Sequence, residues 1–380
     1  MSGPLNVTDL AADLIRHPSV SPDPGESQLA LGAILSAMGF TVTHLPFGEG
    51  AERTPNLFAR LGTGAPHLCF AGHTDVVPPG SAGWTHGPYA GEVADGRLYG
   101  RGACDMKGGI AAFVAAVSAF LADHPEPRGS ISLLITGDEE GPARFGTLKV
   151  LEWMQAHDQI PDFCVVGEPT NPTQMGEVIK IGRRGSINAR ITVNGRQGHV
   201  AYPHRADNPV HRLLRILNAL TTEPLDSGSE WFEPSSLQVT SIDVGNPATN
   251  VIPARASAAL NIRFNELHTG AALAGWISTI CQRYAPGAVV ETQISGESFV
   301  TKPGPEVDAL ATAVRTVTGR EPRLDTGGGT SDARFIALYC PVAEFGLVGT
   351  SMHQVDEHVS VDDLRALTLI YEDLLKRMVA

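Results

Sequence analysis

The sequence predicts an α/β protein with a mainly parallel sheet and a second, ferredoxin-like domain inserted into the first. Short apolar strands alternate with helices in the first half of the chain, which is typical of a parallel sheet covered on both faces. Near residue 184 the strands begin to alternate apolar and other residues, as half-buried strands do. The helix–strand alternation resumes after residue 297.

The first half supplies three helices and five strands. The helices are predicted over 10–17, 27–39 and 107–124, and the second of them ends at Gly39. The strands are predicted over 40–45, 56–62, 67–72, 130–136 and 163–167. The last part of the chain adds a helix that follows the turn "TKPGPE" (301–306) and ends at about residue 318, an apolar strand over 342–348 and a helix over 361–378.

The middle of the chain has the order β-α-β-β-α-β, which is a split βαβ unit of the ferredoxin-like kind. Its elements are predicted over 186–195, 207–220, 236–244, 254–264, 269–284 and 288–295. Asn208 can cap the first helix, and Pro209 suits its first position. We therefore expect residues 1–183 and 298–380 to form one domain and residues 184–297 to form the insertion.

The amino-acid composition limits the classes of binding partner and predicts the cellular compartment. The 380 residues carry a formal net charge of −13, from 28 basic and 41 acidic side chains without a basic block. This balance argues against nucleic acid or an anionic membrane as partner. The five scattered cysteines show no CxxC, and no secretory signal is evident, so we expect a cytoplasmic protein. The apolar stretch 110–122 is too short to span a bilayer and predicts a buried helix.

Histidines and acids fall where the predicted strands end. The residues that follow predicted strands are His73, Asp75, Glu139, Glu140, Glu168 and His353, and Asp105 precedes the long helix inside the Gly-rich "GRGACDMKGG". Ligands of an open α/β sheet bind at the carboxyl ends of its strands. Adjacent like charges such as those of "GDEEG" (137–141) are costly unless positive charge lies nearby. The pattern therefore predicts a metal site at this edge of the sheet.

The ligand types indicate which metal. Imidazole and carboxylate without thiolate suit zinc, with cobalt or manganese as alternatives. The side chains are too numerous for one tetrahedral ion, so we expect two ions. His358 is the rival of His353, because both lie in "HQVDEHV". HExxH and GxSxG are absent, and "GRGACDMKGG" (100–109) lacks the spacing of a phosphate loop.

Five segments carry a resemblance to a known family. "GHTDVV", "GRGACDMKGG", "GDEEG", "GEPT" and "GTSMHQVDE" resemble, in order and spacing, the di-zinc exopeptidase and deacylase family. That family includes aminoacylases, acetylornithine deacetylases and bacterial carboxypeptidases. The similarity runs over essentially the whole chain and implies a metal-dependent amidohydrolase. Cys104 departs from the small Ala or Ser that is more usual there, which leaves the mechanism intact.

The resemblance implies a role for each of these histidines and acids. His73 and Glu168 would hold one zinc ion, Glu140 and His353 the other, with Asp105 bridging the two. Cobalt is a possible substitute for zinc. Asp75 would orient His73 through its second ring nitrogen. Glu139 would be the general base, placed beside a ligand and within reach of the attacking water.

The inserted domain also receives roles through the resemblance. His199 and Asn250 would reach the site of the opposite subunit and stabilise an oxyanion, which implies a homodimer with a closing lid. The candidates for binding the carboxylates of a small anionic substrate are Arg183, Arg184, Ser186, Tyr202, Arg263 and Thr330.

The sequence is compatible with three functions. "GRRGS" (182–186), "GHVAYPHRADNP" (198–209), "NVIPARA" (250–256) and "TGGGTSDARFI" (326–336) resemble one branch of the family, which acts on a polyanionic substrate. A deacylase of acetylornithine or another acyl amino acid is the second reading. A catalytically silent metal- or peptide-binding protein is the third, and it should have lost Glu139 or Asp105, yet both are present.

Overall fold

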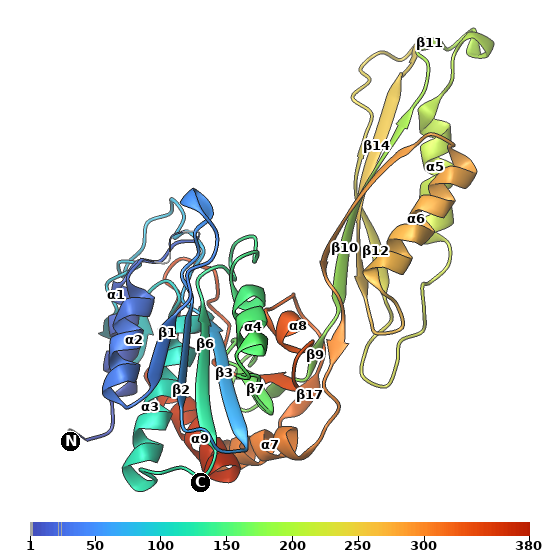
Figure 1. Cartoon of the computed structure of the whole chain (residues 1–380). Coiled ribbons are helices and arrows are strands. Elements are labelled where there is room, and N and C mark those ends of the chain that lie inside the picture. Colours follow the sequence, from blue (N-terminus) through green and yellow to red (C-terminus); the bar gives the residue numbers. More distant parts are fainter. Residues whose placement is uncertain (1–2, 22, 24) are drawn as a thin grey trace. The chain divides into compact units, whose positions relative to one another are not determined.

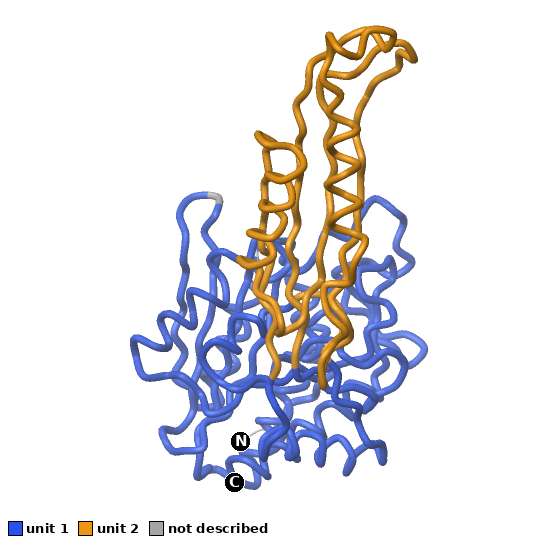
Figure 2. Tube along the Cα trace, turned by 90° about the vertical axis from the view of Figure 1, so that its right-hand side faces the viewer, with its two compact units in different colours: residues 1–181, 301–325, 331–380 blue, residues 182–300, 326–330 orange. Residues whose placement is uncertain are grey.

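The structure, a computed structural model, describes residues 3–21, 23 and 25–380. The chain divides into two compact units, shown in blue and orange in Figure 2. Unit 1 comprises residues 1–181, 301–325 and 331–380, and unit 2 comprises residues 182–300 and 326–330. The role of 184–297 as a lid and dimerisation domain stays a prediction.

Unit 1 is built on an eight-stranded sheet. In spatial order its strands are β1 (Thr41–His44), β2 (Leu57–Leu61), β6 (Ser130–Thr136), β3 (His67–His73), β7 (Phe163–Val166), β18 (Val342–Glu344), β8 (Val178–Lys180) and β17 (Arg323–Asp325). The four neighbours β6, β3, β7 and β18 run parallel. Their carboxyl ends therefore meet at one edge, as the mainly parallel sheet predicted from the sequence requires.

Helices cover both faces of this sheet (Figure 1). They are α1 (Val7–Arg16), α2 (Ser27–Ala37), α3 (Gly108–Asp123), α4 (Thr147–Ala156), α7 (Pro305–Thr318), α8 (Ala333–Ile336) and α9 (Val361–Val379). Helices α3 and α9 pack on each other and on β3, whereas α4 packs on β6 and α8. Phe70, Phe113 and Tyr371 form an aromatic cluster where α3, α9 and β3 meet.

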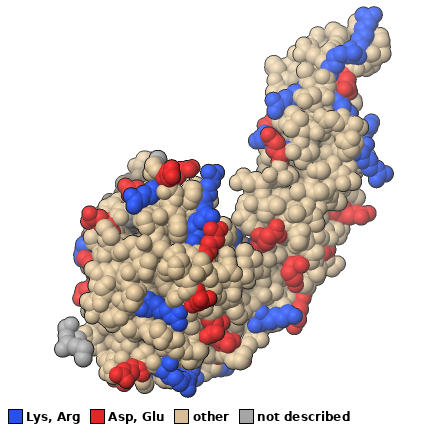
Figure 3. Space-filling model, in the orientation of Figure 1, with Lys and Arg blue, Asp and Glu red and all other residues tan. Residues whose placement is uncertain are grey.

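The long helical stretch Ala103–Asp123 would by length and composition be able to cross a membrane, but 83% of its apolar window is buried inside the fold. A core helix has this character, and eleven residues of α3, from Gly108 to Phe120, are buried. On the face of unit 1 drawn in Figure 3, acidic and basic side chains are interspersed.

Unit 2 has the predicted order β-α-β-β-α-β. Its elements are β10 (Gly185–Asn194), α5 (Pro209–Thr221), β12 (Ser236–Asp243), β14 (Arg255–Phe264), α6 (Gly270–Tyr284) and β15 (Val289–Gly296). The strands form an antiparallel sheet in the order β12-β14-β10-β15. Alternate residues of β10, among them Ile187, Ala189 and Ile191, pack with α5 and α6 in a core of their own.

Short elements complete both units. Unit 1 has a small sheet of β4 (Glu92–Ala94), β5 (Arg97–Tyr99) and β19 (His358–Ser360), with the turns η1 (Gly50–Glu52) and η2 (Ala103–Lys107). Unit 2 has the pairs β9 (Gly182–Arg183) with β16 (Phe299–Val300) and β11 (Gly198–His199) with β13 (Val251–Ile252), and the turn η3 (Pro203–Arg205).

Some elements differ from the predictions. The first helix begins at Val7 rather than at residue 10, because the Asn6 side chain accepts hydrogen bonds from the backbone of Thr8 and Asp9. Helix α4 was not predicted, since no side chain caps its N-terminus at Gly146. The strand predicted over 342–348 ends at Glu344, because the following residues leave the sheet.

Candidate metal centre

The predicted ligand residues follow neighbouring parallel strands. His73 is the last residue of β3, Glu139 and Glu140 follow β6, and Glu168 follows β7. His353 lies in the loop between β18 and β19. Because these strands are adjacent and parallel, the chain delivers all five side chains to the same edge of the sheet.

Asp105 lies between the two histidines. Its Oδ1 is 3.1 Å from Nε2 of His73, and its Oδ2 is 3.2 Å from Nε2 of His353. Glu168 Oε1 lies 3.6 Å from Nε2 of His73, and Glu140 Oε1 lies 2.9 Å from Nε2 of His353. One carboxylate thus presents one oxygen to each of two imidazole–carboxylate pairs, which is the arrangement that a bridging ligand needs.

Among the residues that the structure describes, two overlapping groups of ligand atoms lie close enough to hold a metal ion. His73, Asp105 and Glu140 form one group, and within each group the ligand atoms lie within 4.8 Å of one another. His73, Glu139 and Glu168 form the other. Imidazole and carboxylate donors fit zinc or a related divalent ion. Glu139 is thereby placed both as a candidate base and as a candidate ligand.

The site strongly favours positive charge. Burial opposes protonation of His73, but its hydrogen bond to Asp105 and the charges of Glu139 and Glu168 raise its pKa well above the ordinary value. Hydrogen bonds to Asp105 and Glu140 raise the pKa of His353 to about 10. Burial opposes ionisation of Asp105, yet the two imidazoles hold its pKa below the ordinary value. Bound divalent ions would supply the same positive charge and leave both imidazoles neutral.

Asp75 holds the loop that carries Glu139 and Glu140. Its Oδ1 accepts from the backbone N–H of Glu139 at 3.2 Å, and its Oδ2 from that of Glu140 at 3.0 Å. Burial raises the pKa of Asp75 to about 6. Nδ1 of His73 hydrogen-bonds to the backbone carbonyl of Asp75 at 2.8 Å, whereas the carboxylate is 3.6 Å away. The main-chain carbonyl of Asp75, rather than its carboxylate, is therefore the hydrogen-bond partner that orients the ring of His73.

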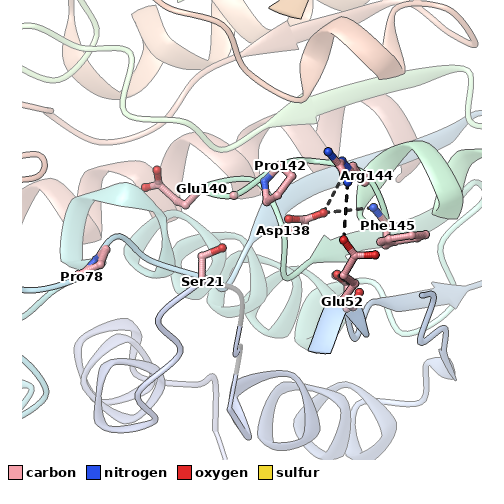
Figure 4. Close-up of a pocket in the computed structure, with 10 residues that line it drawn as sticks. Ser21, Glu52, Pro78, Asp138, Glu140, Pro142, Arg144 and Phe145 are labelled. Carbon is pink, nitrogen blue, oxygen red and sulfur yellow. Dashed lines mark hydrogen bonds and ion pairs between the residues drawn. The ribbon is translucent and has the colours of Figure 1, made fainter. Parts of the chain in front are cut away.

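Asp138, the first acid of "GDEEG", has a structural role instead. It is buried and accepts from the backbone N–H groups of Arg144 (2.7 Å) and Phe145 (3.1 Å). Figure 4 shows it directed toward those residues, with Glu140 pointing the other way. These hydrogen bonds close the loop beside a cavity of about 300 Å³ that Glu140 also lines.

His353, not His358, approaches Asp105. His358 lies in β19 opposite Tyr99, and its Nδ1 hydrogen-bonds to the carbonyl of Asp356. The structure also reveals two residues that the sequence analysis passed over, Arg101 and Glu357. Both are charged yet buried, and neither shows this in a local pattern.

Unit 2 brings His199, Asn250 and Tyr202 together at one end. The backbone N–H of Val200 donates to the carbonyl of Asn250 at 3.0 Å, and that of Tyr202 to the carbonyl of His199 at 2.9 Å. The rings of His199 and Tyr202 are 5.8 Å apart. All three side chains are exposed.

The remaining candidates lie at the other end of the unit 2 sheet. Ser186 faces Arg263 across β10 and β14, but its side chain is only 2% exposed and accepts from Asn261 at 3.1 Å. Arg183 donates to the carbonyl of Gly329 at 3.1 Å, one residue before Thr330. Arg184 is partly buried, and among the described residues its Nε has no hydrogen-bond partner.

A parallel sheet that delivers two histidines and several acids to one edge can hold divalent metal ions, as metal-dependent hydrolases of amide bonds do. The chain belongs to the peptidase family M20/M25/M40, whose family model matches residues 69–377. The predicted resemblance is thereby confirmed.

Relatives and solved structures agree with this assignment. A succinyl-diaminopimelate desuccinylase of Gluconacetobacter diazotrophicus is 71% identical over 97% of this chain and 96% of its own length. An M20 family metallo-carboxypeptidase from Sulfolobus solfataricus has a TM-score of 0.76 at 17% identity, covering 98% of this chain and 99% of its own. A dinuclear metal binding peptidase from Bacillus subtilis has a TM-score of 0.68 at 16% identity, covering 97% and 96%.

Proposed function

We propose that the protein hydrolyses the amide of N-succinyl-L,L-2,6-diaminopimelate to succinate and L,L-2,6-diaminopimelate, a step of bacterial lysine and diaminopimelate biosynthesis. The observation that carries this proposal is the near-full-length identity to succinyl-diaminopimelate desuccinylases. The segments 182–186, 198–209, 250–256 and 326–336 support it, because they resemble the branch of the family that acts on a polyanionic substrate.

Two zinc ions are the proposed cofactors, with cobalt as a possible substitute. His73 and Glu168 would hold one ion, and His353 and Glu140 the other. Asp105 would bridge them, since each of its oxygens faces one imidazole. When bound, such ions polarise the amide carbonyl and lower the pKa of a water molecule.

Glu139 is the proposed base. Its carboxylate would accept the proton of the attacking water and return it to the leaving nitrogen. Burial is the main reason why the pKa of Glu139 is raised well above the ordinary value, and bound divalent ions would lower it again and keep the carboxylate ionised. The hydrogen bond from its backbone to Asp75 would keep the carboxylate in place.

Unit 2 would complete the site from a second subunit. In a homodimer, His199 and Asn250 would reach the partner's site and stabilise the oxyanion that forms at the amide carbon. Arg183, Arg184 and Arg263 would pair with substrate carboxylates through their guanidinium groups. The candidates without charge, which would donate hydrogen bonds to the same substrate, are Ser186, Tyr202 and Thr330. We also propose the cytoplasm as the compartment, because all five cysteines are free and buried.

The test is a comparison of substrates with the zinc-reconstituted protein. N-succinyl-L,L-diaminopimelate, N-acetylornithine and several acyl amino acids would be assayed side by side for kcat/KM. We expect the succinyl substrate to be preferred by orders of magnitude. Preference for N-acetylornithine or another acyl amino acid would retain the metal site and reject the substrate. Zinc binding without turnover of any substrate would point to a silent binding protein.

A further inference from the structure

A buried ion pair joins the two loops that carry Asp105 and His353. Nη1 of Arg101 lies 2.6 Å from Oε2 of Glu357, and the two residues are 2% and 0% exposed. They are 256 positions apart in the chain. Arg101 precedes Asp105 by four residues, and Glu357 follows His353 by four. The pair therefore connects the two segments directly behind the candidate metal ligands.

Glu357 holds the main chain at Asp105. Its second oxygen, Oε1, accepts from the backbone N–H of Cys104 at 3.1 Å and from that of Asp105 at 3.4 Å. The thiol of Cys104 donates to the same oxygen at 3.4 Å. One carboxylate thus accepts both from the arginine and from the peptide that carries the bridging aspartate. Among the described residues, Glu357 belongs to neither candidate group of metal ligands.

Arg101 holds the main chain at His353. Its guanidinium donates to the carbonyl of Gln354 at 3.2 Å and, more weakly, to that of His353 at 3.5 Å. It also donates to the carbonyl of Pro78 at 3.4 Å and lies over the ring of Trp84 at 5.1 Å. The guanidinium fork suits this task, because its donors point in several fixed directions.

The backbone of the His353 loop requires such support. His353 has a φ of 62° and Asp356 a φ of 56°. Both values lie in the left-handed region, which residues other than glycine adopt uncommonly. Such conformations persist only where the surrounding structure fixes them. Asp356 adds a further anchor, since it accepts from the backbone N–H of Thr85 at 2.8 Å.

We propose that Arg101 and Glu357 are positioning residues that set the distance between the Asp105 carboxylate and the His353 imidazole. A buried ion pair adds little net stability by itself, which leaves its placement to be explained. This pair contacts the main chain of Asp105 and of His353, two of the three residues that would bind the second metal ion. The inference rests on the proposed metal site and extends it to groups that touch neither metal nor substrate.

The test measures zinc binding to the metal-free protein by titration calorimetry, independently of turnover. Wild type should bind two ions. Glu357→Gln keeps the shape of the side chain but removes its charge, and we expect one of the two sites to bind zinc about 10–100-fold more weakly. With zinc at saturation, kcat should fall while KM stays close to wild type, because the substrate-binding residues are unchanged.

Arg101→Lys separates positioning from simple charge balance. It keeps both charges, but a single ammonium group cannot reach Glu357 and the carbonyls of residues 353 and 354 together. We expect it to weaken zinc binding by about 10-fold. A zinc affinity in Arg101→Lys equal to that of wild type would overturn the positioning role. This variant also carries the test if Glu357→Gln does not fold.

Lys180→Met is the matched control. It breaks a different ion pair of unit 1, the partly buried pair of Lys180 with Asp325 at 2.5 Å, and neither residue lies in the segments 101–105 or 353–357. We expect a similar loss of thermal stability with both zinc affinities unchanged. If the zinc affinity of Glu357→Gln falls no further than that of this control, the inference is refuted. Wild type that binds fewer than two ions would instead refute the proposed metal site, and the inference with it.

Discussion

The metal-binding edge of unit 1 and the β11–β13 end of unit 2 carry candidate functional residues in opposite environments. At the edge of unit 1, His73 is 1% and Asp105 6% exposed, and they contact each other. At the end of unit 2, Tyr202 is 51% exposed, and His199 and Asn250 are exposed as well. The first set is held by its own unit, whereas the second is free to meet a group from elsewhere. Variants in the two regions should therefore fail in different ways.

Replacement of the proposed base should have the largest effect. We expect Glu139→Gln to lower kcat by about 10²–10⁴-fold, because general base catalysis contributes that much. Turnover and zinc content would be measured on the same sample, and two ions should remain. Loss of an ion would show that Glu139 acts as a ligand with His73 and Glu168, which the geometry also permits.

Replacement of a proposed ligand should show in metal binding first. His353→Ala removes the imidazole next to Asp105 and Glu140, and we expect about 100-fold weaker binding of one zinc ion. His358→Ala is the control, since that ring lies in β19 against Tyr99. Metal titration of both variants would check this, and a larger loss in His358→Ala would exchange their roles.

The exposed residues of unit 2 should affect rate without affecting metal. We expect Asn250→Ala to lower kcat by about 10²-fold with two zinc ions retained, as the loss of an oxyanion donor does. A mixture with Glu139→Gln subunits would test action across the dimer. Half of the dimers would then hold one complete site, which predicts recovery to about a quarter of wild-type activity. No recovery would place Asn250 in the site of its own subunit.

The smallest effect is on stability, inside unit 2. Asp226 accepts from the backbone of Gly228 (2.7 Å) and Ser235 (3.1 Å), from Asn265 (2.8 Å), and faces His268 Nε2 at 2.9 Å. Burial opposes its ionisation, but these hydrogen bonds hold its pKa below the ordinary 3.8. We expect Asp226→Asn to cost about 2 kcal/mol at pH 7.

The pH dependence of that effect has a definite sign. A carboxyl group whose pKa is lower in the folded state stabilises fully above its unfolded pKa, and the stabilisation is lost as pH falls through the folded pKa. The difference between wild type and Asp226→Asn should therefore shrink below about pH 4. Thermal unfolding across pH would measure this, with the exposed Asp243→Asn as control. A difference independent of pH would exclude the charge as its cause.

The sequence predicted most of the fold, because its long elements have strong periodicity. The strands and helices of unit 2 have the predicted order, and the strand ends of unit 1 carry the expected residues. Helix α4 was not predicted, since its N-cap residue is Gly146 and no side chain caps it. The short strand pairs β11–β13 and β9–β16 were not predicted, because strands of two residues are too short to show an alternation of apolar and polar residues.

The site was also predicted only in part from the sequence. Position after a strand predicts that a side chain reaches the edge of the sheet, and His73 and Glu168 follow this rule. The rule does not predict the direction of a side chain within an acidic run, and only the structure shows Asp138 turned toward the backbone of residues 144 and 145. The pairing of Arg101 with Glu357 joins distant segments and leaves no local pattern.

The position of β18 in the sheet has a consequence for how the protein is made. This strand lies between β7 and β8, yet it is synthesised more than 160 residues after either of them. Until the ribosome reaches it, the sheet has a gap, and His353 is missing from the site although His73, Asp105, Glu140 and Glu168 already exist. Non-local pairing of this kind forms late and slowly. The nascent chain therefore acquires the full set of proposed ligands only after residue 353 has been made.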